Sequence, residues 1–239
     1  MAGTRDSGLG TRDEAPVLTI DGPSGVGKGS VSARVARELG WHVLDSGAVY
    51  RAVAAAALDQ RLDPDDEAGL VGLCESLNLD FEAGDDGILV RLDGEAIDER
   101  LRTEQVSSMS SKVAALPAVR AALLDLQRSF RRLPGLIADG RDMGTVVFPD
   151  APIKVFLDAS VEERANRRYK QLKDKGENVK FLRLFRDLEA RDRRDRERAV
   201  SPTVAADDAV VIDSTRLSLD QVVERVVDEV RRRARHLGT

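Results

Sequence analysis

The feature that most restricts the fold is a glycine-rich segment near the start of the chain, Gly22-Pro23-Ser24-Gly25-Val26-Gly27-Lys28-Gly29-Ser30. Two glycines separated by four residues and followed by lysine form the pattern of a phosphate-binding loop. Such a loop lies between a strand and a helix, because its backbone N–H groups and the positive end of the helix both face the phosphate. The apolar run 17–21 before the segment and the helical spacing of Val31, Val35 and Leu39 after it meet this requirement. We therefore predict that residues 22–30 cradle the phosphates of a triphosphate.

Four further apolar runs, at 41–45, 135–139, 153–158 and 209–213, have the length of buried strands. Each of them ends in aspartate, as the run 17–21 does. Strands joined by helical segments and short connections predict right-handed strand–helix–strand units and a parallel sheet. We therefore expect an α/β fold of the P-loop NTPase type, with a parallel five-stranded sheet flanked by helices. The aspartates would lie at the carboxyl edge of the sheet, where such folds bind ligands, although aspartate there also caps the next helix.

The rest of the sequence indicates how the chain is divided. Residues 1–15 are rich in Gly, Thr, Arg and Asp without a period, and we expect them to form a disordered tail outside the fold. Residues 16–239 are expected to form a single domain. Between the second and third strands, about 61–133, the chain is too long for a loop and contains a hairpin pattern, followed by a helical pattern at 106–130 that Pro117 interrupts. This stretch predicts an inserted subdomain.

Charge and cysteine content argue against several classes of protein. The 37 basic and 42 acidic residues give a net charge of −5, which disfavours a nucleic-acid or anionic-membrane binder. The single cysteine, Cys74, excludes an intrachain disulfide and a thiolate metal cluster, and it indicates a reducing, cytoplasmic environment. No apolar run is long enough to span a bilayer. The two histidines, His42 and His236, are too few for a histidine metal site and provide no Ser-His-Asp arrangement.

One position departs from the usual phosphate-binding loop. Gly29 follows the lysine where a Ser or Thr hydroxyl normally binds Mg²⁺, and Ser30 comes one place later. This form is shared with small-molecule kinases, and the chain has no Asn-Lys-x-Asp motif that would indicate a GTPase. We expect Mg²⁺ to be held mainly by phosphates and water, with Ser30 as a candidate ligand and Asp139 orienting a bound water. Other strand ends offer competing carboxylates: Asp45, Asp158 and Asp213.

Phosphoryl transfer depends more on positioned cations than on a strong base. Arg51 lies one turn into the helix that begins at Ser46. Arg141 and Asp142 directly follow the strand that ends at Asp139. Both segments would emerge at the sheet edge that carries the phosphate-binding loop. The alternative for each arginine is a surface ion pair.

Arginines and acids alternate through residues 186–198, which supports two interpretations. In the first, ion pairs four residues apart stabilise a solvated helix: Asp187 with Arg191, Glu189 with Arg193, and Asp192 with Arg196. In the second, Arg191, Asp195 and Arg198 share one helical face and belong to a mobile lid, about 176–200, that brings arginines to the transferring phosphate. The expected catalytic residues are Lys28, Arg141, Arg191 and Arg198.

Four segments carry a resemblance to a known family: 19–29, 44–51, 137–149 and 191–198. Together they resemble the bacterial cytidylate kinases, which are P-loop nucleoside monophosphate kinases that use ATP to phosphorylate CMP and dCMP. The Asp-Ser-Gly-x-x-Tyr-Arg and Asp-Gly-Arg-Asp-Met-Gly sequences in the second and third segments are more specific than the phosphate-binding loop. The resemblance covers the chain from about Pro16 to near its C-terminus.

The resemblance implies an insert that helps to close over the monophosphate, and a role for each of nine residues. Cytosine would be contacted by Ser46, Arg120 and Asp142. The acceptor phosphate would be held by Arg51, Arg141 and Arg198. The sugar would be met by Ser111, Arg191 and Asp195.

We therefore expect transfer of the γ-phosphoryl group of ATP with Mg²⁺ to CMP or dCMP, by a monomer. One alternative is a kinase for another small acceptor, such as a different nucleotide or shikimate. A second is a nucleotide-gated interaction module that docks a partner on the 186–198 helix. A third is nucleic-acid binding through the same arginines, which the interleaved acids oppose.

Overall fold

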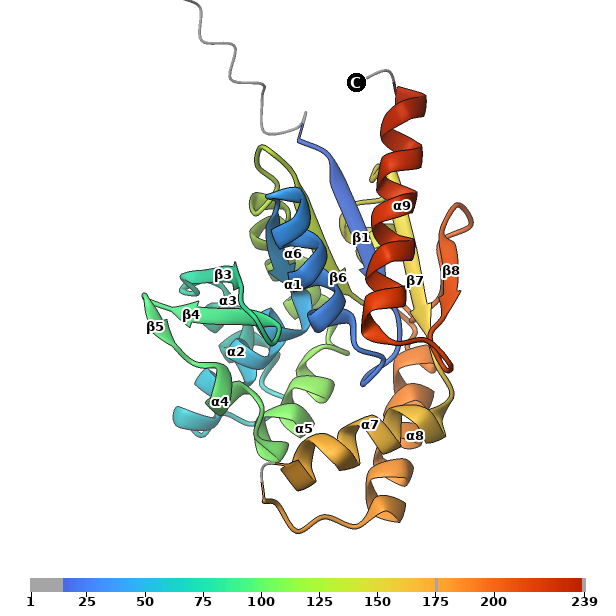
Figure 1. The fold of residues 1–239 in the computed structure, drawn as a ribbon. Coiled ribbons are helices and arrows are strands. Elements are labelled where there is room, and N and C mark those ends of the chain that lie inside the picture. Colours follow the sequence, from blue (N-terminus) through green and yellow to red (C-terminus); the bar gives the residue numbers. More distant parts are fainter. Residues whose placement is uncertain (1–14, 175, 238–239) are drawn as a thin grey trace, which may run out of the picture.

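The computed structural model describes residues 15–174 and 176–237, with a five-stranded parallel sheet at the centre (Figure 1). The strand order is β2-β6-β1-β7-β8. The bounds are β1 Val17–Asp21, β2 His42–Asp45, β6 Leu136–Gly140, β7 Ile153–Asp158 and β8 Val210–Asp213. The five apolar runs therefore form the predicted strands, and the α/β fold with a parallel sheet is confirmed.

The aspartates at the strand ends lie at the same edge of the sheet. Asp45 pairs in register with Asp139, and Asp158 pairs with Asp213. Asp21, at the end of the central strand β1, lies opposite Gly140. Because all five strands run in one direction, this carboxyl edge also receives the loops that follow them.

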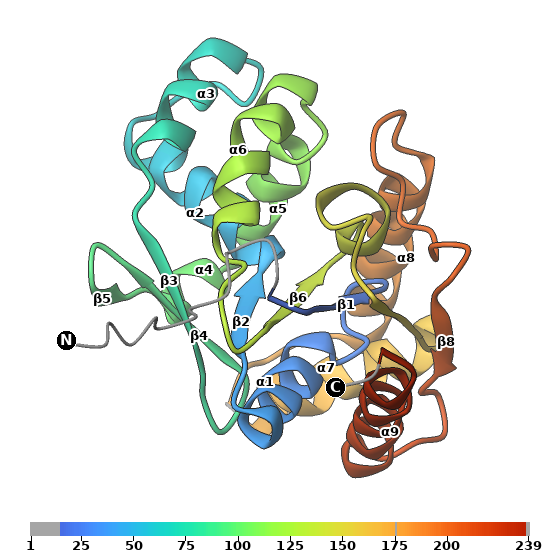
Figure 2. The same ribbon diagram turned by 90° about the horizontal axis from the view of Figure 1, so that it is seen from above.

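Helices cover both faces of the sheet, as Figure 2 shows. On one face lie α1 (Lys28–Leu39) and α9 (Leu219–Leu237). On the other lie α2 (Ser46–Asp59), α3 (Glu67–Glu75), α5 (Glu104–Val113) and α6 (Pro117–Ser129). The predicted helical spacing in α1 is confirmed, because Val31 and Val35 are buried and Gly40 ends the helix at a φ of 67°.

The stretch 61–133 contains the expected hairpin and the expected helices. β3 (Leu79–Ala83), β4 (Ile88–Leu92) and β5 (Glu95–Ala96) form an antiparallel sheet, followed by the short helix α4 (Asp98–Leu101). Pro117 is the first residue of α6, where its fixed φ suits a helix start. The buried side chains of the hairpin, Leu79, Phe81, Ile88 and Val90, belong to the same hydrophobic core as the strands of the large sheet.

Two further helices, α7 (Val161–Asp174) and α8 (Phe181–Glu197), pack against each other beyond the carboxyl edge (Figure 1). We call this pair the arm. The short π-helix η2 (Met143–Val147) follows β6. Arg198 is the residue after α8 and has an extended backbone, with ψ 133°, so it does not lie on the helix as its spacing predicted.

Three sequence expectations concern the N-terminal tail, Cys74 and membrane spans. Of the predicted tail 1–15, residues 1–14 lie outside the described part. Ala15 is buried, and its carbonyl accepts a hydrogen bond from Arg131 Nε at 2.8 Å. Cys74 is buried in α3, as expected. None of the helices in the described ranges has the length and apolar character needed to cross a membrane.

Candidate active site

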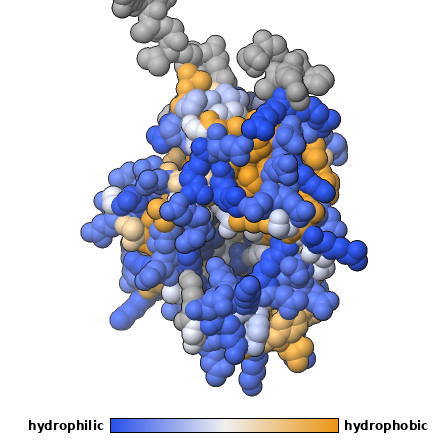
Figure 3. Space-filling model, viewed as in Figure 1, coloured by the Kyte–Doolittle hydropathy of each residue, from blue (hydrophilic) through white to orange (hydrophobic). Residues whose placement is uncertain are grey.

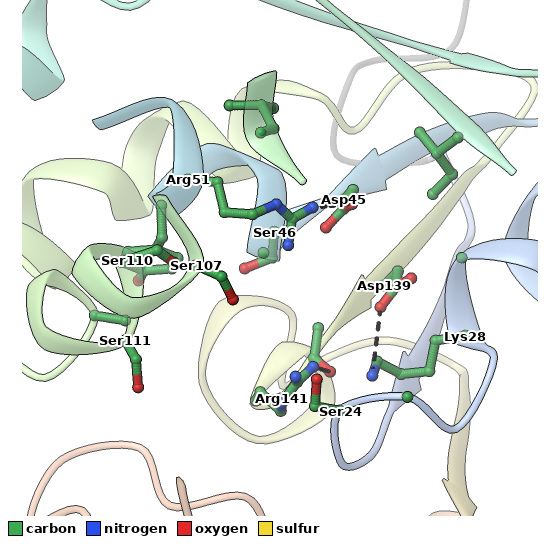
Figure 4. A pocket seen from close by; sticks show the side chains of 18 of the residues that line it. Ser24, Lys28, Asp45, Ser46, Arg51, Ser107, Ser110, Ser111, Asp139 and Arg141 are labelled. Atoms are coloured by element: carbon green, nitrogen blue, oxygen red, sulfur yellow. Dashed lines mark hydrogen bonds and ion pairs between the residues drawn. The ribbon is translucent and has the colours of Figure 1, made fainter. Parts of the chain in front are cut away.

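A cavity of about 370 Å³ opens at the carboxyl edge of the sheet, between the phosphate-binding loop, α2, α5, α6 and the arm (Figure 4). In the space-filling view the surface is hollowed below α1 (Figure 3). The volume is within the range typical of small-molecule sites. Most of the predicted site residues line it: Ser24, Gly25, Gly27, Lys28, Gly29, Ser30, Ser46, Arg51, Ser111, Arg120, Asp139, Arg141, Asp142, Arg191, Asp195 and Arg198. Gly22, Pro23 and Val26 belong to the loop, but they do not line the cavity.

The phosphate-binding loop has a backbone that its glycines make possible. Gly22, Gly25 and Gly27 have φ values of 146°, 77° and 99°. At Gly22 a Cβ atom would lie 2.0 Å from the carbonyl oxygen of Leu157, so no side chain fits there. No side chain caps the first turn of α1, which leaves its N–H groups available to an anion.

Lys28 is buried at the base of this loop. Its Nζ donates to the carbonyls of Gly22 and Pro23, at 2.9 and 3.0 Å, and lies 3.9 Å from a carboxylate oxygen of Asp139 (Figure 4). Burial, reinforced by the nearby Arg141, lowers the pKa of Lys28 to about 7. Burial also raises the pKa of Asp139, against the opposing charge of Lys28. An incoming phosphate would compete with the two carbonyls for the lysine.

Two arginines of the cavity, Arg51 and Arg141, are bonded to acidic side chains. Arg51 donates to Asp45 at 2.7 Å, and Arg141 donates to Asp195 at 3.2 Å. The second of these bonds connects the loop after β6 with α8 in the arm. Arg51 and Arg141 therefore reach the cavity, and each has an acidic partner there.

Several polar atoms of the cavity are buried without a partner. Within the described residues, the hydroxyl of Ser111, Nε of Arg191, and both Nε and Nη2 of Arg198 have no hydrogen-bond partner. Arg191 makes one contact, from Nη1 to the hydroxyl of Ser107 at 3.2 Å, and burial lowers its pKa to about 10. Buried donors without partners are costly, so this cluster indicates a site for an anionic, hydroxyl-bearing ligand.

A second polar cluster lies deeper, between α2, α6 and η2. The hydroxyl of Ser46 donates to the side-chain carbonyl of Gln127 at 2.6 Å. Arg120 forms a buried ion pair with Asp142 and lies over the ring of Tyr50, 5.4 Å from its centroid. Ser46, Arg120 and Asp142, which the resemblance groups together, are thus brought together by the structure.

Sequence reasoning missed Gln127, which accepts a hydrogen bond from Ser46, and several residues that line the cavity. Gln127 follows Arg120 by seven positions and shares the buried side of α6 with it, and that spacing was an available signal. No comparable pattern marks the others: Tyr50, Arg102, Ser107, Ser110, Arg168 and Gln171.

The arm is attached to the phosphate-binding loop by Arg164, which is 1% exposed. Arg164 donates to the carbonyl of Ser24 at 2.8 Å and forms a bidentate ion pair with Asp192 on α8. Asp192 therefore binds a buried arginine of α7 instead of Arg196, and the interpretation of a solvated helix is wrong at this position. Asp187 does pair on the exposed surface, with Arg183 at 3.7 Å instead of Arg191.

Two oxygen donors beside the loop could contribute to binding Mg²⁺. Asp139 and Ser30 line the cavity, as does Asp45, but Asp45 already binds Arg51 and caps α2 by accepting from the N–H of Ala48 at 2.8 Å. Asp158 and Asp213 lie outside the cavity lining. The described residues contain no cluster of three or more His, Cys, Asp or Glu side chains that could hold a metal. This sparse set of oxygens fits an ion that keeps waters and takes its other ligands from phosphates, as Mg²⁺ does.

Comparison with known proteins identifies close relatives. The family model for cytidylate kinase matches residues 18–232. The chain is 56% identical to the cytidylate kinase of Aeromonas salmonicida over 89% of this chain and 93% of that protein. It is 57% identical to the one from Methylococcus capsulatus over 89% and 96%, and 55% identical to the one from Klebsiella pneumoniae over 90% and 95%. Among solved structures, shikimate kinase from Acinetobacter baumannii is similar with a TM-score of 0.41 and 17% identity, over 91% of this chain and 93% of that one.

Proposed function

Because this chain belongs to the cytidylate kinase family, we propose that it transfers the γ-phosphoryl group of ATP to CMP or dCMP, giving ADP and CDP or dCDP. The observation that carries the proposal is one cavity that joins a phosphate-binding loop to buried arginine donors without partners. The loop is built to bind the phosphates of the donor. The arginines are suited to the phosphate of the acceptor, because guanidinium groups bind phosphate oxygens in pairs.

Residues 22–30 would bind ATP through backbone N–H groups, and Lys28 would exchange the carbonyls of Gly22 and Pro23 for phosphate oxygens. Arg141, Arg191 and Arg198 would stabilise the charge on the transferring phosphoryl group. Arg51 would hold the acceptor phosphate together with Arg141 and Arg198. These cations occupy the cavity before the substrates bind, so the charge stabilisation is preorganised.

The sugar and the base would occupy the rest of the cavity. Ser111, Arg191 and Asp195 would contact the sugar, and Ser46 and Arg120 would contact cytosine. The carboxylate of Asp142 can accept a hydrogen bond from the exocyclic amine of cytosine, whereas the carbonyl that uracil carries at that position would repel it. Burial of Asp142 makes this discrimination strong, because water cannot replace a missing partner.

Mg²⁺ bound with ATP would neutralise charge on the donor phosphates. Ser30, and Asp139 through a water molecule, would hold it. The arm, with the lid segment of about 176–200, and the insert of about 61–133 would close over the substrates and exclude water. All of these groups come from one chain, so we propose that the monomer is the active form.

The test is an assay of ADP release from ATP with Mg²⁺, run separately with CMP, dCMP, UMP, AMP, GMP and shikimate at equal concentrations. We expect rapid turnover of CMP and dCMP and little with the others. ATP hydrolysis that does not depend on any acceptor would refute the proposal.

Asp142→Ala tests the base contact. This substitution should lower the ratio of kcat/KM for CMP over UMP by roughly 100-fold, since a buried charge-assisted hydrogen bond is lost. Asp125→Ala, on the exposed side of α6, serves as the matched control and should leave the ratio unchanged. An unchanged ratio in Asp142→Ala would remove Asp142 from the recognition of the base.

A further inference from the structure

Asp21 is a buried carboxylate that none of the steps above uses. It ends the central strand β1, is 5% exposed, and precedes the phosphate-binding loop. One carboxylate oxygen accepts from the backbone N–H of Met143 and the other from that of Gly144, both at 2.8 Å. Burial raises the pKa of Asp21 to about 6, opposed by these two bonds, so at pH 8 both oxygens are acceptors.

Met143 and Gly144 are the first two residues of η2, and the residue before them is Asp142. The first N–H groups of a helix have no partner within it. An aspartate at the position of Asp142 commonly accepts with its own carboxylate from the second or third of these N–H groups, here Gly144 or Thr145, as an N-cap. Here no cap bond forms from Asp142, and Asp21 occupies the N–H groups of Met143 and Gly144 from a strand 122 and 123 residues away.

The consequence is that the carboxylate of Asp142 is left to face the cavity. It forms the ion pair with Arg120 on α6, while its backbone carbonyl accepts from the N–H groups of Val146 and Val147 at 2.9 and 3.2 Å. The turn into η2 is therefore held by hydrogen bonds to the carbonyl of Asp142 and from the N–H groups of Met143 and Gly144. Without Asp21, the N–H of Gly144 would be open to the carboxylate of Asp142.

We propose that Asp21 is a positioning residue for base selectivity, which caps η2 in place of Asp142 and so keeps the carboxylate of Asp142 directed at the base. The proposal rests on the function proposed above for Asp142. Asp21 is also the residue directly before Gly22, the first residue of the loop that would bind ATP. It therefore lies between the ATP loop and the segment that carries Asp142.

The test is a double-mutant cycle in which the ratio of kcat/KM for CMP over UMP is measured at pH 8. Asp21→Asn keeps the size of the side chain but replaces one acceptor by an N–H₂ group that faces a backbone N–H. We expect it to lower the ratio by roughly tenfold, about the effect of one misplaced hydrogen bond to a charged group. KM for CMP should rise more than KM for ATP. In the Asp142→Ala background the same substitution should change the ratio by less than about twofold, because the carboxylate through which Asp21 acts is absent.

Asp66→Asn is the matched control, since Asp66 caps α3 by accepting from the N–H of Gly69 at 3.0 Å, outside the cavity. It should leave the ratio unchanged. The proposal is overturned if Asp21→Asn keeps the wild-type ratio, or if it lowers the ratio equally in both backgrounds. If Asp142→Ala alone does not change the ratio, the proposed role of Asp142 fails and the inference fails with it. Folding is checked by thermal unfolding, and if Asp21→Asn does not fold, the smaller Asp21→Ser is judged by the same criteria.

Discussion

Replacing Asp192 by alanine would leave the guanidinium of Arg164 buried with no carboxylate beside it. The two side chains of this pair are 1% and 5% exposed. Removal of one partner from a buried ion pair costs about 3–5 kcal/mol. Arg164 would keep its bonds to the carbonyls of Ala159 and Ser24, at 3.0 and 2.8 Å, so we expect the lower end of that range.

The same helix provides the comparison. Asp187 pairs with Arg183, and these side chains are 62% and 66% exposed. Such an exposed pair stabilises a protein by about 0.3–0.5 kcal/mol, so Asp187→Ala should have almost no effect. For a domain of this size, 1 kcal/mol corresponds to about 2–4 °C in Tm, which gives a decrease of roughly 6–12 °C for Asp192→Ala and of about 1–2 °C for Asp187→Ala.

The assay is thermal unfolding of the wild type and both variants by circular dichroism in one buffer, with chemical denaturation as a second measure of the free energy of unfolding. Asp192→Asn, which retains one acceptor for Arg164, should melt between Asp192→Ala and the wild type. If Asp192→Ala and Asp187→Ala melt within about 2 °C of each other, the pair with Arg164 does not hold the arm and the reasoning from burial fails.

Three further outcomes follow from the site. The pKa of Lys28 is about 7 in the free protein, and bound phosphates favour its charged form, so ATP binding at pH 8 should take up close to one proton. Calorimetry in two buffers of different ionisation enthalpy measures this uptake. Equal binding enthalpies in the two buffers would contradict it. Gly22→Ala should abolish ATP binding, because its Cβ would lie 2.0 Å from the carbonyl oxygen of Leu157, whereas Gly94→Ala, where φ is positive but the space is open, should bind ATP normally in the same titration. Arg141→Met should lower kcat at saturating substrates by about 100-fold, measured in the coupled assay, and an effect confined to stability would reassign Arg141 to a structural role.

The sequence was informative where one local pattern determines one local structure. Short apolar runs that end in aspartate predicted the five strands of the parallel sheet. The central strands β1 and β6 are buried on both faces, which requires such a run. The phosphate-binding loop was recognisable because its glycines and lysine act within nine consecutive residues. Positions such as Ser46, Arg120 and Asp142 were reached only through resemblance to a family, since nothing in their own neighbourhoods predicts that they meet.

Partners that are distant in sequence could not be found from the sequence. Asp192 has an arginine four residues later, and the pattern of a helix does not reveal that its actual partner, Arg164, is buried on the preceding helix. The cap of η2 is equally hidden, because Asp21 precedes it by more than 120 residues. Both cases require knowledge of which faces pack together, and the packing is decided by the whole fold.

The shared core of the hairpin and the large sheet has a consequence for engineering. The hairpin strand β3 packs against α1 and β2, and its Phe81 belongs to the core that also contains Leu18 and Ile137 of the central strands. A graft of residues 61–133 from another kinase would have to match these surfaces side chain by side chain, or it would leave cavities and clashes. The insert is therefore not an interchangeable module. Acceptor preference in this scaffold has to be redesigned by substitutions within the cavity.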